Sequence, residues 1–269
     1  MSYQDLTNRI KKNFKVLGAA KIIGGLMSAL TLLLIGRALG VEKFGIFSMV
    51  ISAVEICNIF LSFRVWDTAV KFIGENLEKR RTASKYLSLS LLLGLASSAI
   101  SFLIIILITN LFAENLFSSV SNSKQLVITY SIVVLFISLN EIIDGILRVL
   151  DRYKSIFKIN IYTNLFRLLL VITTLILFGL NIQNIINCFV LSYICGFIVR
   201  IIFLTEALKL SSITINPLDL PNSQSCFRFT KFMLNAHFSN ILNIANDKNL
   251  GVLAVGYLAT PYYAGLYRA

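Results

Sequence analysis

Long apolar stretches separated by short polar ones dominate this sequence. No charged residue lies between Lys85 and Glu114, and none lies between Arg167 and Arg200. About 20 helical residues cross the hydrocarbon core of a bilayer, where only helices and closed barrels satisfy their own backbone hydrogen bonds. The pattern therefore predicts an all-α fold, a polytopic bundle of transmembrane helices.

The apolar stretches predict about eight spans of this length. We expect them at residues 17–36, 44–63, 86–110, 125–147, 159–178, 182–204, 232–246 and 250–267. Asn216-Pro217 and Pro221 mark the one longer connection. The expected organisation is an amphipathic cytoplasmic N-terminus (1–16), a first lobe of six helices (17–210), a cytoplasmic linker (211–227) and the start of a second lobe with two helices (228–269).

Composition agrees with a membrane protein, and charge sets the expected orientation. Apolar residues make up 57% of the chain and charged residues 14%, with a net charge of +12. Lysines and arginines gather before the first span and in alternate connections, whereas the opposite connections contain only Arg37, Lys43, Lys124 and Lys248. Because cytoplasmic loops carry the basic excess, we expect a cytoplasmic N-terminus. We expect no nucleic-acid partner, since no basic stripe lies on a soluble domain.

Neither enzyme motifs nor metal-ligand spacing is found in the sequence. The four cysteines lack C-x-x-C spacing, and His237 with Asp247 offers too few ligands for a metal. No Walker loop, dinucleotide fingerprint or nucleophile–base cluster occurs, and the outward connections leave no room for a catalytic domain. We therefore expect a protein that is not an enzyme and needs no cofactor beyond a coupling proton or sodium ion.

Part of the chain repeats. Gly36 and Gly45 recur 220 positions later as Gly256 and Gly265, and Phe47 corresponds to Tyr267. Both segments combine a basic lead-in, an apolar span, a break and a glycine that opens the next span. Parallel repeats are a common plan in transporters. We interpret the first unit as six spans and the second as only begun, so we expect a fragment or a protein that acts as a half.

The segment between the first two spans resembles a family signature. Residues 34–47, LIGRALGVEKFGIF, are similar to the R-x-L-G-x-x-x-F-G-x-aromatic pattern of the polysaccharide biosynthesis (O-antigen) flippases. These belong to the multidrug/oligosaccharidyl-lipid/polysaccharide exporter superfamily. Residues 63–72 and 247–257, the latter leading to 264–267, resemble the same family. The likeness covers the first lobe and the start of the second, which implies a truncated member.

The resemblance implies a function and a location. Such proteins flip undecaprenyl-pyrophosphate-linked oligosaccharides across the bacterial cytoplasmic (inner) membrane by alternating access, for O-antigen, lipopolysaccharide and other polysaccharide synthesis. Implied partners are the bilayer, the lipid-linked glycan, a polysaccharide polymerase and other assembly proteins, with a second half or a homodimer completing the transporter. Alternatives are a multidrug exporter, a peptidoglycan-lipid flippase, a membrane-embedded polysaccharide polymerase or transferase, and a nonfunctional truncated flippase.

Charges within spans are the candidate site residues, because a charge at bilayer depth is costly without a partner or a wet cavity. In span four, Glu141, Asp144 and Arg148 share one helix face, which Asn140 adjoins. Two interpretations stay open. Either Asp144 and Arg148 neutralise each other while Arg200 reaches the interface, or these groups line a cavity in which arginines hold the pyrophosphate and carboxylates bind a coupling ion.

Two further groups are candidates for contact with the substrate. Asn160, Asn164 and Arg167 form a polar stripe on span five, at a depth from which Arg167 cannot easily reach the interface. Arg64, Asp67 and Lys71 follow span two at helical spacing. They are either a first contact for an anionic head group or orientation signals alone.

The last candidates lie in spans two and seven. His237, Asn240, Asn243 and Asp247 are spaced to form one polar face of a continuous helix. We expect Asn240 and Asn243 to line the cavity, and His237, Asp247 and the span-two residue Glu55 to join Glu141 and Asp144 in ion coupling. A structural hydrogen bond is the alternative role for His237.

Overall fold

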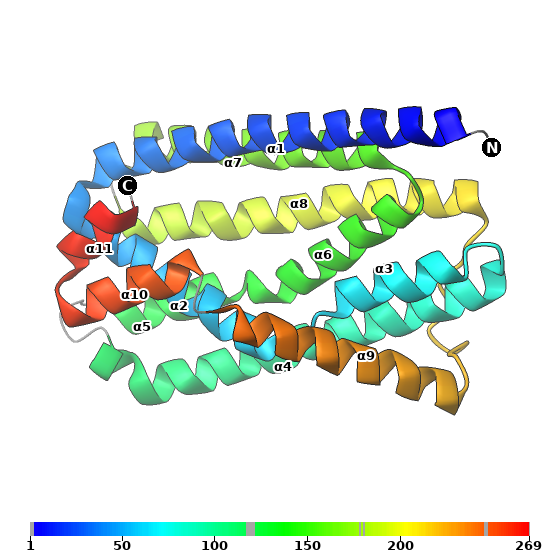
Figure 1. Cartoon of the computed structure of the whole chain (residues 1–269). Helices are drawn as coiled ribbons and strands as arrows, with labels where there is room; N and C mark the ends of the chain where they lie inside the picture. Colours follow the sequence, from blue (N-terminus) through cyan, green and yellow to red (C-terminus); the bar gives the residue numbers. More distant parts are fainter. Residues whose placement is uncertain (1–2, 117–121, 178, 180, 245–246, 269) are drawn as a thin grey trace.

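The computed structural model describes residues 3–116, 122–177, 179, 181–244 and 247–268, and it is all-helical over these ranges (Figure 1). The helices are α1 (Tyr3–Leu39), α2 (Val41–Leu61), α3 (Val65–Glu75), α4 (Arg80–Leu116), α5 (Ser123–Ser131), α6 (Val134–Val149), α7 (Tyr153–Leu177), α8 (Ile182–Ser211), α9 (Ser223–Leu242), α10 (Lys248–Leu258) and α11 (Pro261–Arg268).

Six stretches of the described chain are long and apolar enough to cross a membrane. They are Asn13–Leu39, Val41–Leu61, Arg80–Leu111, Ser123–Val149, Tyr153–Leu177 and Ile182–Ser211. Each coincides with one of the first six expected spans. The residues expected to form the last two spans lie in α9, α10 and α11, which are too short or too polar to meet the same criterion. The chain is a multi-pass membrane protein.

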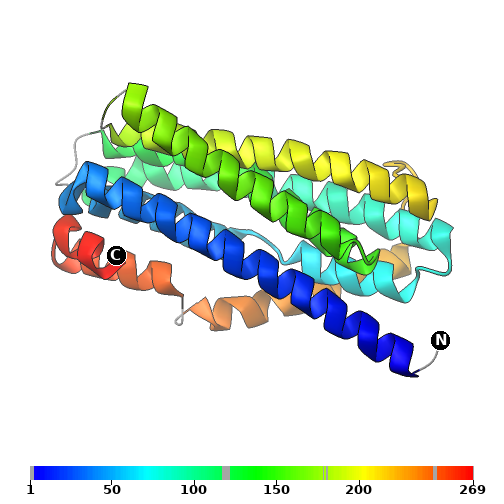
Figure 2. The same ribbon diagram turned by 90° about the horizontal axis from the view of Figure 1, so that it is seen from above.

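The helices differ in how much of their surface packs against the rest of the protein. Within the most apolar part of each stretch, 61% of the residues are buried in α2 and in the α5–α6 stretch. The corresponding share is 22% in α1 and 17% in α7. Leu26 and Ile176 are examples of the large apolar side chains that α1 and α7 expose. Because lipid solvates such surfaces, α2, α5 and α6 form the centre of the bundle, while α1 and α7 lie side by side at its edge (Figures 1 and 2).

The amphipathic N-terminal residues, expected to lead into the bilayer, are continuous with span one in the single helix α1. Two helix boundaries differ from expectation. Span four is divided between Ser131 and Val134 into α5 and α6. The connection after α8 is shorter than expected, because the Asn222 side chain accepts a hydrogen bond from the Ser225 amide and starts α9 at Ser223.

The helix connections lie at two opposite ends of the bundle. The N-terminus and the α3–α4, α6–α7 and α8–α9 connections gather at one end, and the α1–α2, α7–α8 and α10–α11 connections gather at the other (Figure 1). The first group contains the basic segments that are expected to face the cytoplasm. The alternation of ends therefore matches the expected threading of the chain.

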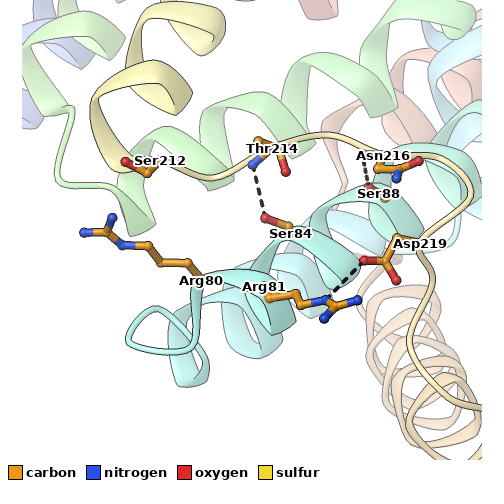
Figure 3. A pocket seen from close by; sticks show the side chains of 8 residues that line it. All are labelled: Arg80, Arg81, Ser84, Ser88, Ser212, Thr214, Asn216 and Asp219. Atoms are coloured by element: carbon orange, nitrogen blue, oxygen red, sulfur yellow. Dashed lines mark hydrogen bonds and ion pairs between the residues drawn. The ribbon is translucent and has the colours of Figure 1, made fainter.

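The α8–α9 connection is attached to the start of α4 (Figure 3). Backbone amides of Thr214 and Asn216 donate hydrogen bonds to the hydroxyls of Ser84 and Ser88, at 3.1 and 3.0 Å. Lys85 Nζ lies 2.8 Å from an Asp219 carboxylate oxygen. This hydrogen bond from Lys85 is the main reason that the pKa of Asp219 falls below its usual range.

We predict that Asp219→Asn loosens this connection. The substitution removes the carboxylate that Lys85 holds, so amide hydrogen exchange at residues 212–220 should accelerate while exchange in α8 stays unchanged. Since the pKa of Asp219 is lowered, its contribution is present at neutral pH and is lost only as pH falls through that lowered value. Equal exchange in Asp219→Asn and the unmodified chain would show that the ion pair does not hold the connection.

Candidate functional site: a polar pocket within the bundle

Most of the predicted polar residues of spans four and five converge on one pocket between α6, α7 and α8. Its volume is about 270 Å³. It is lined by Ile137, Asn140, Glu141 and Asp144 of α6, by Asn160, Thr163, Asn164 and Arg167 of α7, and by Tyr193 and Arg200 of α8. The structure thus brings together six residues that helix spacing alone had placed on two separate stripes.

An ion pair between helices forms one wall of the pocket. Arg200 Nε and Nη2 donate to the two carboxylate oxygens of Asp144, at 3.0 and 3.1 Å. Parallel donation of this kind matches the planar guanidinium to the planar carboxylate. The interpretation that Asp144 pairs with Arg148 of its own helix is therefore wrong. Arg200 is buried rather than extended to the interface, because its partner lies inside the bundle.

The sequence of α8 places Arg200 opposite Asp144. Phe189, Tyr193, Gly196 and Arg200 recur at helical spacing and form one face of α8. A methyl group added to Gly196 would lie 2.9 Å from the Thr163 methyl carbon, so glycine allows α7 and α8 to approach closely. The spacing of an aromatic, a glycine and an arginine within a long uncharged run is the signal that could have identified this face.

Arg167 is held by different contacts. Its Nε donates to the Ser192 hydroxyl at 3.0 Å, and its guanidinium lies 5.0 Å and 5.2 Å from the ring centres of Phe189 and Tyr193. Among the described side chains, no carboxylate forms an ion pair with Arg167. Its positive charge is thus positioned by a hydroxyl and two aromatic faces and is not cancelled by a salt bridge.

The remaining lining is rich in amides and includes a second carboxylate. Asn164 donates from Nδ2 to the Asn160 carbonyl at 2.8 Å and accepts from the Ser28 hydroxyl at 3.0 Å, which ties α7 to α1. Glu141 is exposed and forms no ion pair within the described part of the chain. Glu141 and Arg167 are therefore the acidic and basic side chains of this lining that form no ion pair within the described residues.

Arg64, Asp67, Lys71 and Arg148 lie outside this pocket, around the start of α3. Arg64 pairs with Asp67 and donates from Nη1 to the Asn240 amide oxygen of α9 at 2.8 Å. The guanidiniums of Arg64 and Arg148 lie 5.3 and 5.6 Å from the Trp66 ring centre. Lys71 Nζ lies 4.0 Å from the Phe232 ring centre. These cations bind aromatic faces that join α3 to α6 and α9.

The prediction of one continuous polar face on span seven is wrong. Helix α9 ends at Leu242 with Asn243 as its C-terminal cap, and Asp247 starts α10 by accepting a hydrogen bond from the Asn249 amide at 2.8 Å. Residues 245–246 of the expected span lie outside the described residues. Asn240, Asn243 and Asp247 line a separate pocket of about 130 Å³.

His237 is separated from that smaller pocket. It is buried, with its ring 5.0 Å from the Phe63 ring, and no described residue bonds its Nδ1.

Glu55 belongs to a partly buried polar cluster that includes three residues missed by sequence reasoning, Ser52, Asn249 and Arg268. Asn249 donates from Nδ2 to a Glu55 carboxylate oxygen at 2.7 Å. Arg268 Nη1 donates to the Asn249 amide oxygen at 2.8 Å and to the Ser52 hydroxyl at 3.1 Å. This cluster, Ser52–Glu55–Asn249–Arg268, joins α2 to α10 and α11. Only the tertiary contact reveals that these three residues are involved.

Solved structures of membrane transporters have a similar fold. A MATE structure in the straight conformation superposes with a TM-score of 0.69 at 18% identity, over 95% of this chain and 58% of that one. A MOP superfamily transporter from Pyrococcus furiosus Vc1 gives 0.61 at 15% identity, over 96% of this chain and 62% of that one. An inward-facing MATE family transporter gives 0.63 at 16% identity, over 90% of this chain and 56% of that one.

The chain therefore spans less than two thirds of the length of these transporters. The family model for polysaccharide biosynthesis proteins matches residues 10–269. The chain belongs to this family. A search of curated proteins found no match.

We predict that the Asp144–Arg200 pair is coupled in stability. Asp144→Asn or Arg200→Gln alone leaves one buried charge without a partner, which costs about 3–5 kcal/mol. The double variant should lose less than the two single variants together. Thermal unfolding of the purified protein measures these losses, with Arg148→Gln as control. Additive losses, or a loss in Arg148→Gln as large as in Asp144→Asn, would contradict the assignment.

Proposed function

We propose that this protein takes part in flipping undecaprenyl-pyrophosphate-linked oligosaccharides for polysaccharide or O-antigen synthesis across a bacterial inner membrane. The observation that carries the proposal is the lining of the pocket between α6, α7 and α8. It combines three asparagine amides, a threonine, a tyrosine, two carboxylates and two guanidiniums within about 270 Å³. Family membership supports the same conclusion.

The chemistry of this lining fits a sugar. Sugar hydroxyls both donate and accept hydrogen bonds, and amides and carboxylates supply both kinds of partner. The Tyr193 ring offers an apolar face beside them. The volume lies below the roughly 300–1,000 Å³ of drug-sized pockets. The pocket therefore fits part of a lipid-linked oligosaccharide, with the rest of the substrate outside it.

The pyrophosphate needs cations that are not already neutralised. Arg200 forms an ion pair with Asp144, and Arg64 forms one with Asp67, so neither arginine offers a free positive charge. Among the predicted site residues, the cations that remain are Arg167 inside the pocket and the exposed Arg148 and Lys71 near the end that contains the N-terminus. In the proposed orientation, this end faces the cytoplasm, from which the substrate arrives.

The proposed class, a flippase of lipid-linked oligosaccharides, also implies a second lobe, coupling ions and a downstream partner. Alternating access would require a second lobe, completed by further chain or by a partner copy. Protons or sodium ions would act on the carboxylates Glu55, Glu141, Asp144 and Asp247, with His237 as a proton relay. A polysaccharide polymerase would receive the product.

A multidrug exporter is the second candidate, supported by the likeness of the fold to MATE structures. An exporter of apolar cations needs a mainly apolar pocket with acidic groups. Here the lining is mainly polar, and Glu141 shares it with the guanidinium of Arg167, so the pocket lacks the apolar, acidic character that such a substrate needs.

Binding of the two substrate classes tests the proposal. We predict that the chain in nanodiscs binds undecaprenyl-pyrophosphate-linked oligosaccharide, and that Arg167→Gln weakens binding about tenfold or more, since a charge-assisted hydrogen bond contributes about 1.5–3 kcal/mol. Native mass spectrometry measures the affinity. Glu206→Gln serves as control, because Glu206 is an exposed carboxylate of α8 outside the pocket.

Two results would overturn the proposal. One is equal binding by the unmodified chain and Arg167→Gln. The other is binding of a lipophilic cation such as ethidium with no binding of the lipid-linked glycan, which would favour the exporter.

A further inference from the structure

A second polar pocket lies between the start of α4 and the α8–α9 connection (Figure 3). Its volume is about 250 Å³, and Arg80, Ser84 and Ser212 are among the side chains that line it. One water occupies about 30 Å³ of the liquid, so this space holds a small polar group together with several waters. The pocket shares no lining residue with the pocket between α6, α7 and α8.

The charges around this second pocket leave one guanidinium free. Two guanidiniums but only one carboxylate line it, and that carboxylate, Asp219, lies 2.8 Å from Lys85 Nζ and 3.7 Å from Arg81 Nε. Arg80 forms no ion pair or side-chain hydrogen bond within the described residues. Figure 3 shows its side chain extending away from Asp219, to the side where Ser212 lies. The pocket therefore has an excess of positive charge, which favours an anion.

Two hydroxyl groups border the same space as the Arg80 guanidinium. Ser84 Oγ accepts a hydrogen bond from the Thr214 amide at 3.1 Å, and among the described residues its own proton has no acceptor. Ser212 ends α8 in the left-handed conformation, with φ at 56°, and its exposed hydroxyl bonds to none of the described residues. A guanidinium and hydroxyls supply donors alone or donors with acceptors, so together they match the several acceptor oxygens of a phosphate group.

The position of the pocket places it at the surface of the bilayer. It lies at the start of the span Arg80–Leu111 and at the end of the span Ile182–Ser211. The chain beside it exposes large apolar side chains, and Leu218 is 93% exposed. The others are Leu210, Ile215 and Leu220. Exposed apolar side chains next to cations at the end of a span are typical of a surface that contacts lipid.

We propose that this pocket binds the phosphate group of an anionic phospholipid, whose acyl chains lie over the exposed apolar side chains of the connection. Arg80 donates to the phosphate oxygens, and the hydroxyls of Ser84 and Ser212 add hydrogen bonds. Basic pockets between transmembrane helices on the cytoplasmic side bind lipid head groups in this way. A zwitterionic lipid fits less well, because its amine needs a carboxylate and Asp219 is already paired.

A lipid in this position has a structural consequence. It contacts α4 and the α8–α9 connection at once, and this connection leads from the first repeat unit to the second. The lipid therefore adds to the hydrogen bonds that attach the connection to α4. The site does not depend on the proposed function, because the ligand is a lipid of the surrounding bilayer and the lining residues are different.

Lipid titration of the purified chain in detergent tests this site. Native mass spectrometry should show that the first phosphatidylglycerol binds more tightly than the first phosphatidylethanolamine. Arg80→Gln should weaken this binding roughly tenfold, because it removes a charge-assisted hydrogen bond to the phosphate. Arg80→Lys keeps the charge but loses the planar fork, so its affinity should lie between the other two.

Two controls make the test specific. Lys79→Gln removes a positive charge from the residue before Arg80, which is exposed and does not line the pocket, so the affinity should stay unchanged. Free glycerol phosphate, at the concentration of the lipid, should not displace phosphatidylglycerol, because it lacks the acyl chains that contact the connection.

Three results would overturn the proposal. The first is equal binding of phosphatidylglycerol by Arg80→Gln and the unmodified chain, and the second is an equal loss in Lys79→Gln and Arg80→Gln. The third is displacement of the lipid by glycerol phosphate, which would make a free phosphate the ligand. Arg167→Gln should not affect this binding, so a failure here is distinguishable from a failure of the lipid-linked oligosaccharide to bind.

Discussion

The requirement that a charge inside a bilayer must find a partner organises this protein. Asp144 and Arg200 meet this requirement through two parallel hydrogen bonds between α6 and α8. The described part of the bundle contains two apolar clusters, one around α2, α5 and α8 and one around α3, α4 and α6. The ion pair forms one wall of the polar pocket between α6, α7 and α8.

The same constraint explains the chemical character of the pocket. With Asp144 and Arg200 neutral as a pair, Glu141 and Arg167 contribute opposite charges and the lining has no net formal charge. A neutral pocket rich in amides can stay hydrated in a low-dielectric surrounding at a lower cost than one with excess charge.

The spans could be read from the sequence because membrane insertion depends on composition. The charge-free runs in α4 and α8 mark two helices, and helix spacing correctly grouped Asn140, Glu141 and Asp144 on one stripe and Asn160, Asn164 and Arg167 on another. Sequence could not tell which helices face each other. The pairing of Asp144 with Arg200 and not with Arg148 depends on the packing of α6 against α8, which is a tertiary contact.

The errors at α9 have a similar origin. Spacing predicted a polar face from His237 to Asp247 on one helix. A helix ends, however, where its backbone hydrogen bonds end. Here Asn243 and Asp247 cap two separate helices, and the Asn240 amide oxygen accepts a hydrogen bond from Arg64 at the start of α3. Capping side chains and face-lining side chains are the same residue types, so composition does not separate the two roles.

The contact between Gly45 of α2 and Gly265 of α11, equivalent positions of the repeat, also bears on ancestry. A methyl group added to Gly45 would lie 3.0 Å from the Gly265 nitrogen, and one added to Gly265 would lie 3.1 Å from the Gly45 nitrogen. Equivalent positions that touch satisfy the rule for a twofold, self-complementary interface, in which one patch recognises its own copy. After duplication, substitution of either glycine alone introduces a clash, so the two positions are constrained to remain alike while the surrounding halves diverge.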